Sequence, residues 1–252
     1  MAAKSSRLFD PASSEPFRLS RSKIDLFFRC PRCFYLDRRL GIGQPGGPPF
    51  SLNIAVDELL KREFDAFRAQ QRPHPLMEAN GIDALPFRHP DLDVWRDSLR
   101  RGITASLSGT TFVITGGIDD VWVSRCGALH VVDYKATAKQ GEVSIDEEWQ
   151  IAYKRQVEIY QWLFRQNGFD VDDVAYFVYC NGDKSVDAFH GRLNFSIKVI
   201  PYRGSTAWVD GALREAHATL ASGVIPDAAA GCDFCRYRKR AAAEEAWTAG
   251  SH

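Results

Sequence analysis

A chain of 252 residues, 45% of them apolar and 25% charged, is long enough for one substantial hydrophobic core and has the composition of a globular protein. No apolar run approaches the ~20 residues that span a bilayer, and residues 1–17 lack the hydrophobic segment of a signal peptide. We therefore exclude a membrane-spanning protein and expect a cytoplasmic one. The formal net charge of zero neither favours nor excludes a polyanionic partner.

The first half of the chain is predicted to be mainly helical. Apolar side chains at a helical period predict a helix over 20–40, interrupted at Pro31 and followed by a loop rich in Gly and Pro. The next helix, 52–69, has an apolar face made of Leu52, Val56, Leu59, Leu60, Phe64 and Phe67. An irregular stretch of about twenty residues should follow, and then a helix near 91–106.

The second half alternates strands and helices. Residues 111–124 and 128–136 are β-rich and separated by a short polar turn, which predicts a hairpin. A helix over 146–166 should precede strands at 173–180 and 187–200, joined by a turn at Asn181-Gly182-Asp183. A last helix is expected at 204–222. This order predicts a mixed α/β fold, with a central mixed sheet flanked by helices.

The hairpin carries the strongest chemical pattern. Asp133 and Lys135 are two residues apart on a predicted strand, so their side chains project from the same face. The hairpin can bring Asp119 beside Asp133, whereas Asp120 would face the opposite side. Two converging carboxylates can hold Mg²⁺ or Mn²⁺, and a neighbouring lysine can orient water and stabilise negative charge. The alternative is that Asp133 and Lys135 form a surface ion pair.

Basic residues cluster near both ends of the folded part. Arg29 and Arg32 belong to one cluster, and Arg236, Arg238, Lys239 and Arg240 form the other. Each cluster flanks a pair of cysteines. The two segments are either solvated faces or parts of one phosphate-binding patch.

Four cysteines form two Cys-x2-Cys pairs about two hundred residues apart: Cys30 with Cys33, and Cys232 with Cys235. In a reducing compartment such pairs indicate metal binding rather than disulfides. Four thiolates suit either tetrahedral Zn²⁺ or a [4Fe–4S] cluster, and the spacing does not separate them. Cys126 and Cys180 stand alone, and we expect both to be small core residues.

In their order along the chain, these motifs resemble those of the PD-(D/E)XK nuclease superfamily, in particular its RecB-like branch, which includes the CRISPR-adaptation exonucleases. The resemblance rests on Gly116-Gly117-Ile118-Asp119, on Val132-Asp133-Tyr134-Lys135, and on Gln156 and Tyr160 in the following helix. The two cysteine pairs complete the pattern, and the likeness covers about residues 20–240.

The resemblance implies a restriction-endonuclease-like fold and a role for each matching residue. Asp119 and Asp133 would bind Mg²⁺ or Mn²⁺, Lys135 would be catalytic, and Gln156 and Tyr160 would reach toward a nucleic-acid strand or toward the site. The family commonly supplies one more metal ligand, a His or an acid, from an earlier helix. This chain has no His there, so Asp57, rather than its neighbour Glu58, is our predicted ligand.

The resemblance also implies that the four cysteines bind a [4Fe–4S] cluster joining the N-terminal and C-terminal segments. Family members commonly divide these cysteines one and three, whereas this chain divides them two and two, which keeps Zn²⁺ open as the alternative. We expect one nuclease-like domain over 18–240, between a disordered segment at 1–17 and a flexible tail at 241–252. Its parts are a helical part (18–110), a catalytic α/β core (111–202), and a C-terminal helix with a cysteine knuckle (203–240).

The predicted function is hydrolysis of DNA phosphodiester bonds, in single strands or at DNA ends, during repair, CRISPR or defence processing. The basic segments, with Arg29 and Arg32, would hold the nucleic-acid backbone. No phosphate-binding loop for ATP is present, so no nucleotide cofactor is expected, and unwinding would need a partner such as a helicase. The alternatives are a non-catalytic nucleic-acid-binding module of a larger complex and a zinc-stapled scaffold protein.

Overall fold

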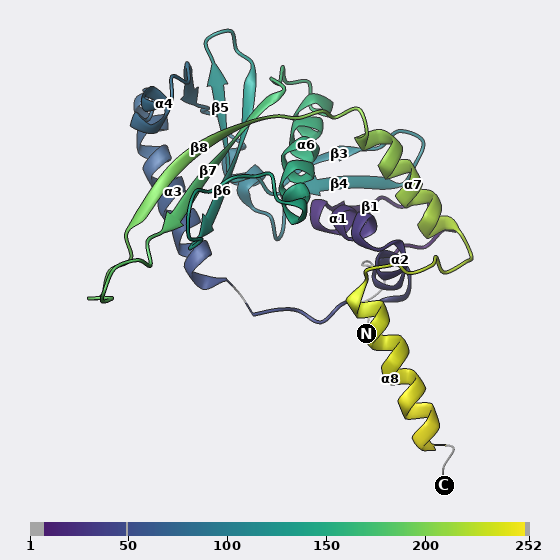
Figure 1. The fold of residues 1–252 in the computed structure, drawn as a ribbon. Coiled ribbons are helices and arrows are strands. Elements are labelled where there is room, and N and C mark those ends of the chain that lie inside the picture. The colour runs from purple at the N-terminus through teal and green to yellow at the C-terminus, as the bar shows by residue number, and fades with distance from the viewer. Residues whose placement is uncertain (1–7, 49, 250–252) are drawn as a thin grey trace. The chain divides into compact units, whose positions relative to one another are not determined.

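A computed structural model describes residues 8–48 and 50–249 of the chain (Figure 1). The chain divides into two compact units. We name them the terminal unit, which comprises Met1–Gly47, Ser106–Ile114 and Asp210–His252, and the sheet unit, which comprises Pro48–Ala105 and Thr115–Val209. The terminal unit thus combines segments from near both ends of the chain with one short internal segment.

The sheet unit contains five strands in the order β2-β5-β6-β7-β8. Their bounds are β2 Ala84–Pro86, β5 Asp120–Ser124, β6 Leu129–Thr137, β7 Val174–Gly182 and β8 Phe195–Arg203. β5 and β6 form the predicted antiparallel hairpin, whereas β6 and β7 are parallel. A parallel pair needs a crossover connection, which is supplied here by η2 (Glu148–Gln150) and α6 (Ile151–Gln166).

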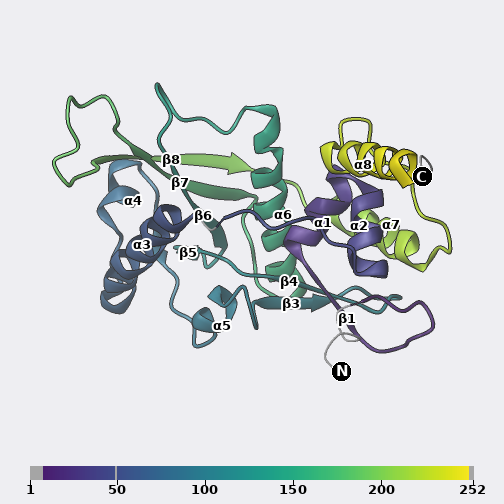
Figure 2. The same ribbon diagram turned by 90° about the horizontal axis from the view of Figure 1, so that it is seen from below.

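Helices cover the two faces of this sheet (Figures 1 and 2). On one face α3 (Ser51–Gln70) packs Leu60 and Phe64 against Trp122, Val132 and Tyr134. Because side chains alternate along β6, Asp133 and Lys135 point to the other face, where α6 lies. The predicted mixed α/β fold with a central mixed sheet flanked by helices is confirmed.

Several helices form the terminal unit: α1 (Arg21–Arg29), α2 (Pro31–Leu40), most of α7 (Val209–Ala221), and α8 (Asp233–Ala249). Pro31 starts α2, so the predicted helix over 20–40 is divided where expected. A three-stranded sheet has the order β1-β4-β3, with bounds Phe17–Ser20, Phe112–Gly116 and Ile103–Ser106. Strands β3 and β4 are also where the chain passes between the units.

Some local predictions differ from the structure. The helix expected near 91–106 is a short helix, α5 (Leu92–Arg96), followed by strand β3, and the stretch expected to be irregular contains α4 (Pro75–Ala79) and β2. β7 and β8 stay paired up to Gly182 and Phe195, so residues 183–194 replace the predicted tight turn. On α3, Leu52 and Leu59 are exposed, because the buried face is narrower than the apolar one.

Parts of both predicted flexible ends are described. Phe9 is buried and makes edge-on contacts with Phe17 and Phe112. Helix α8 extends through residues 241–249. Residues 1–7 and 250–252 of the two predicted disordered ends lie outside the described residues. Among the described helices, none is long and apolar enough to cross a membrane.

His217 on α7 makes the terminal unit sensitive to acid. Its ring lies 5.3 Å from that of Phe9 and 4.9 Å from that of Phe112, and burial lowers its pKa below the usual 6.5. The unfolded chain therefore binds a proton at a higher pH than the folded chain, so stability should fall as the pH drops below about 6.5. In thermal unfolding followed from about pH 8 to pH 5, His217→Gln should lose less stability on acidification than the parent. An equal loss in both proteins would contradict this prediction.

Candidate functional site

Asp119 lies between two other acids of the sheet unit, Asp57 and Asp133. Asp57 lies on α3, Asp119 directly precedes β5, and Asp133 lies in β6. The hairpin register pairs Asp120 with Val132, so the next position along places Asp119 opposite Asp133. The backbone N–H of Tyr134 donates to Asp119 Oδ2 at 2.9 Å, which fixes the orientation of that carboxylate.

Lys61 places a positive charge between two of these acids. Its Nζ lies 2.7 Å from Asp57 Oδ2 and 3.6 Å from Asp119 Oδ1. Burial and the negative charge of Asp119 together raise the pKa of Asp57, although Lys61 opposes the shift. The two carboxylates are thus close enough to repel each other, and a cation between them is stabilising.

The free oxygen of Asp57 suits a metal ion. Asp57 Oδ1 is buried and has no hydrogen-bond partner among residues 8–48 and 50–249. A buried carboxylate oxygen without a partner is costly unless a cation satisfies it. Asp119 and the buried Asp133 offer further carboxylate oxygens, the kind of ligand that Mg²⁺ or Mn²⁺ prefers. Among the described residues, however, only the four paired cysteines bring three or more ligand atoms within 4.8 Å of one another, so the three acids are not a preformed metal site in this structure.

Lys135 is held beside these acids by four neighbours. Its ammonium forms a close ion pair with Asp133, lies 3.4 Å from Gln156 Oε1, and sits 4.4 Å from the centre of the Tyr153 ring. Tyr179 is its partner on the adjacent strand β7. The Lys135 side chain is only 14% exposed, so its ammonium group is held among these neighbours and is not mobile in solvent.

Gln156 and Tyr160 lie on the side of α6 that faces Lys135. Gln156 Nε2 donates to the Tyr160 hydroxyl at 3.2 Å, and the two residues are 8% and 2% exposed. Tyr160 packs so closely on Gly116 that a Cβ there would lie 2.6 Å from its ring. The pair is directed toward Lys135, not toward the surface, so in this structure Gln156 supports the lysine.

Asp120 belongs to a separate buried network. It is fully buried, receives hydrogen bonds from Arg68, Arg96 and the Tyr134 hydroxyl, and faces away from Asp119. Arg96 also donates from Nε to the backbone oxygen of Asp119 at 3.0 Å. This network fixes the start of β5 and therefore the position of Asp119.

Sequence reasoning missed Lys61 and Arg96. The i, i+4 spacing of Asp57 and Lys61 on a predicted helix could have identified the first pair. Arg96 gave no such signal, because its partners Asp65, Asp119 and Asp120 lie far from it in the sequence.

Gly117 allows a close approach of two chain segments just before Asp119. A Cβ at this position would lie 2.2 Å from Ser98 Cβ and 2.5 Å from Ser98 Cα. Because backbone atoms must move to admit it, we expect Gly117→Ala to destabilise the protein by about 1–3 kcal/mol in denaturant unfolding. Gly211→Ala is the matched control, since open space surrounds Gly211 within helix α7 and its substitution should be neutral or stabilising. Equal stabilities of the parent and Gly117→Ala would contradict the prediction.

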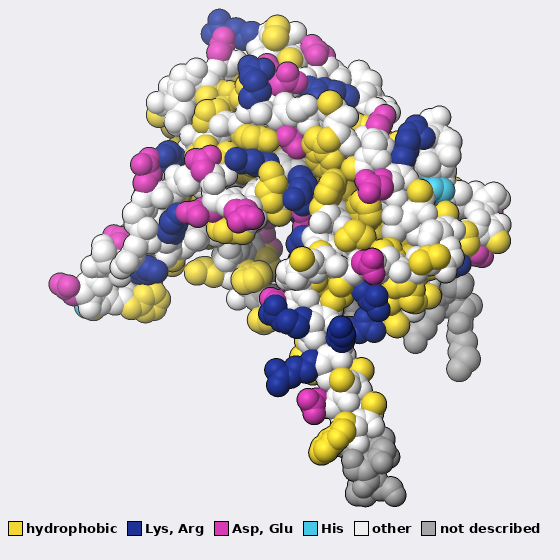
Figure 3. All heavy atoms as spheres, turned by 45° about the vertical axis from the view of Figure 1, so that its right-hand side comes forward, with side chains coloured by type: hydrophobic (Ala, Val, Ile, Leu, Met, Phe, Trp, Pro, Cys, Tyr) yellow, Lys and Arg dark blue, Asp and Glu magenta, His cyan; other side chains and the backbone are white. Residues whose placement is uncertain are grey.

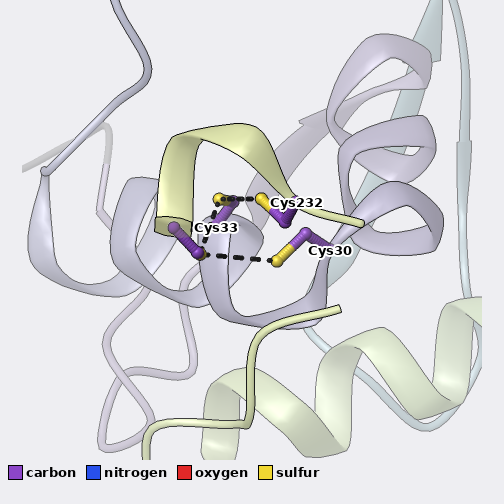
Figure 4. A group of neighbouring side chains, drawn as sticks. Cys30, Cys33 and Cys232 are labelled. Carbon is purple, nitrogen blue, oxygen red and sulfur yellow. Dashed lines mark hydrogen bonds between the residues drawn. The ribbon is translucent and has the colours of Figure 1, made fainter. Parts of the chain in front are cut away.

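The four paired cysteines gather in the terminal unit (Figure 4). Their sulfur atoms all lie within 4.8 Å of one another, and the separations are 3.8 Å for Cys30–Cys235, 3.5 Å for Cys33–Cys232 and 3.5 Å for Cys33–Cys235. One pair lies at the start of α2 and the other at the start of α8. The predicted four-cysteine site between the N-terminal and C-terminal segments is thus confirmed as a cluster.

Cys30 is prepared to act as a thiolate. Burial alone would raise its pKa, but hydrogen bonds, above all from the backbone N–H of Ala229 at 3.5 Å, lower the pKa to about 7. A thiolate is the form that binds metal. Cys180 is a buried core residue as predicted, whereas Cys126 is exposed.

The basic residues of the terminal unit are accessible. The Arg29 side chain is 57% exposed and pairs with Asp25 at 3.0 Å, and Arg32 donates to the backbone oxygen of Pro226 at 3.5 Å. Lysine and arginine side chains also gather near the start of α8 (Figure 3). A role of these residues in nucleic-acid binding stays a prediction.

A mixed sheet whose central hairpin brings two carboxylates and a lysine together beside a third acid is an arrangement suited to metal-dependent phosphodiester hydrolysis. The chain belongs to the PD-(D/E)XK nuclease superfamily, whose family model matches residues 18–240. Members of this superfamily are generally nucleases that use divalent metals.

The chain was also compared with solved structures and with curated sequences. The crystal structure of the protein SSO0001 resembles this chain with a TM-score of 0.39 and 17% sequence identity, over 79% of this chain and 74% of that one. No curated protein matches the sequence.

Proposed function

We propose that this protein is a metal-dependent deoxyribonuclease that cleaves single-stranded DNA or DNA ends and belongs to the RecB-like branch of its superfamily. The observation that supports this most is the position of Asp119 between Asp57 and Asp133, with Lys135 paired to Asp133. A binding module needs neither the buried unpartnered oxygen of Asp57 nor a lysine fixed at the acid cluster.

Each residue has a distinct task in this proposal. Asp57, Asp119 and Asp133 hold Mg²⁺ or Mn²⁺, which when bound polarises the phosphodiester and lowers the pKa of water. Lys135 presents its ammonium to the attacked phosphate and stabilises the negative charge that develops there. Gln156 and Tyr153 keep that ammonium in place.

Lys61 is proposed to leave its position when the metal binds. Its ammonium now balances Asp57 and Asp119, and a divalent cation bound by the same oxygens would replace that charge. Arg68 and Arg96 would keep Asp119 in position with or without metal. Both donate to its neighbour Asp120, and Arg96 also donates to the backbone oxygen of Asp119.

The cysteine cluster is proposed to be a structural metal centre. Zinc–sulfur bonds of about 2.3 Å give a tetrahedron with sulfur atoms about 3.8 Å apart. Three of the sulfur–sulfur separations here are 3.5–3.8 Å, and all lie within 4.8 Å. This spacing favours a single ion, whereas the family resemblance favours [4Fe–4S], which places four iron atoms between the thiolates. Analysis of iron, sulfide and zinc in anaerobically purified protein separates the two.

The wider role proposed is processing of DNA in repair, CRISPR or defence pathways in the cytoplasm, with unwinding supplied by a partner such as a helicase. Arg29, Arg32 and the basic residues of α8 are proposed to hold phosphates of the same substrate. Their exposure and charge support this assignment.

The test is cleavage of DNA labelled at one end, single-stranded and duplex, with Mg²⁺ or Mn²⁺ and with EDTA as the metal control. Matched RNA strands test the preference for DNA. We expect metal-dependent cleavage that is faster on single strands or from ends, and the product ladder gives the polarity. Binding without cleavage by the folded protein would favour the recognition module, and neither binding nor cleavage would favour the scaffold.

A further inference from the structure

One aromatic side chain beside the acid site has no place in the core. Trp149 in η2 is 61% exposed, whereas Trp95, Trp122 and Trp162 are 6% exposed or less. An exposed tryptophan forgoes the burial of a large apolar surface. The position is therefore suited to a ligand that covers the ring.

The exposed ring is connected to the proposed catalytic lysine by a single residue. The ring of Trp149 meets that of Tyr153 edge-on, with centroids 5.4 Å apart and an interplanar angle of 80°. The Lys135 ammonium in turn lies 4.4 Å from the centre of the Tyr153 ring. Trp149 and Tyr153 thus extend from Lys135 to the surface of the sheet unit, and we call these two residues the aromatic platform.

The platform is held in a fixed orientation. η2 is anchored by Gln150, which is 3% exposed, donates to the Ser144 backbone oxygen at 2.7 Å, and accepts from the Glu147 N–H at 2.9 Å. Tyr153 is half-buried and restrained by the lysine above its ring. A preorganised aromatic surface costs little conformational entropy when a ligand stacks on it.

We propose that Trp149 stacks on an unpaired base of the strand whose phosphate is held at Lys135. This inference rests on the proposed nuclease function and specifies its substrate as single-stranded. Bases in a duplex already stack on one another, so an aromatic platform binds only bases that are unpaired or displaced from the helix. Because every base has a π-face, this binding is tolerant of sequence.

The test measures binding without cleavage, by fluorescence anisotropy of a labelled single strand and its duplex in EDTA. Loss of one stacked base costs about 1–3 kcal/mol, so Trp149→Ala should weaken single-strand binding by about 5- to 150-fold. Duplex binding should stay unchanged, and Trp149→Phe should retain most of the affinity. Phe189→Ala, which removes an aromatic side chain that is 71% exposed in the connection between β7 and β8, is the matched control and should bind like the parent.

The outcomes separate this inference from the proposed function. A parent protein that binds neither DNA in EDTA and cleaves neither with Mg²⁺ or Mn²⁺ overturns both, and one that cleaves single strands with metal but shows no single-strand binding in EDTA overturns the platform alone. If the parent binds and cleaves but Trp149→Ala has unchanged affinity, the platform alone is overturned and the nuclease stands. The exposed ring would then be available for contact with a protein. Equal losses for single strand and duplex would also overturn it, because stacking on an unpaired base requires a selective loss.

Discussion

The Asp133→Asn variant should lose DNA cleavage almost completely while keeping its fold. Asp133 is fully buried, pairs with Lys135, and lies opposite Asp119. An amide in its place removes one charged metal ligand. Because this ligand would supply several kcal/mol of transition-state stabilisation, its loss should slow cleavage by about 10³-fold. Single-turnover cleavage with saturating Mn²⁺ measures this loss.

The control for this variant lies in the same unit. Asp187→Asn changes an exposed acid in the connection between β7 and β8 and should cleave like the parent. Circular dichroism should show the same secondary structure in all three proteins. A folded Asp133→Asn protein with more than about a tenth of the parent rate would exclude Asp133 as a metal ligand.

The Cys33→Ser variant should lose the bound metal and much of the stability of the terminal unit. Cys33 Sγ lies 3.5 Å from the sulfur atoms of both Cys232 and Cys235, so its loss breaks the link between segments about two hundred residues apart. Structural metal binding contributes directly to folding. A loss of about 5 kcal/mol would lower Tm by about 10–20 °C.

Cys126→Ser is the control that distinguishes loss of a cluster cysteine from loss of a thiol elsewhere in the protein. Cys126 is exposed and lies outside the cluster, so its substitution should leave both metal content and Tm unchanged. Elemental analysis and thermal unfolding of the three proteins make the comparison. A Cys33→Ser protein with normal metal content and normal Tm would rule out a structural centre at these cysteines.

The strand pattern of the hairpin could be predicted because it is local. Alternation along β6 placed Asp133 and Lys135 on one face, and the short turn brought Asp119 opposite Asp133. The Cys-x2-Cys pairs were equally local, although only the fold shows that they meet. These features need no knowledge of distant contacts beyond a hairpin.

Other features depend on contacts that no short pattern contains. Residues 91–106 contain enough helix-forming side chains to suggest one helix, but pairing in a sheet makes 103–106 a strand. The sequence placed Gln156 on the same helical face as Tyr160, but its contact with Lys135 is visible only in the fold, where α6 packs over β6. The sequence likewise does not show that Trp149 is exposed, because exposure depends on which side chains the folded sheet unit covers.

The most direct test of the active site compares the Lys135→Met and Lys184→Met variants in single-turnover cleavage and in Mn²⁺ binding. Lys135 is fixed beside Asp133, whereas Lys184 is exposed in the connection between β7 and β8. We predict that Lys135→Met cleaves about 10²–10³-fold more slowly than the parent yet still binds Mn²⁺, and that Lys184→Met matches the parent in both measurements. Undiminished cleavage by a folded Lys135→Met protein would contradict the assignment of the active site to this edge of the sheet.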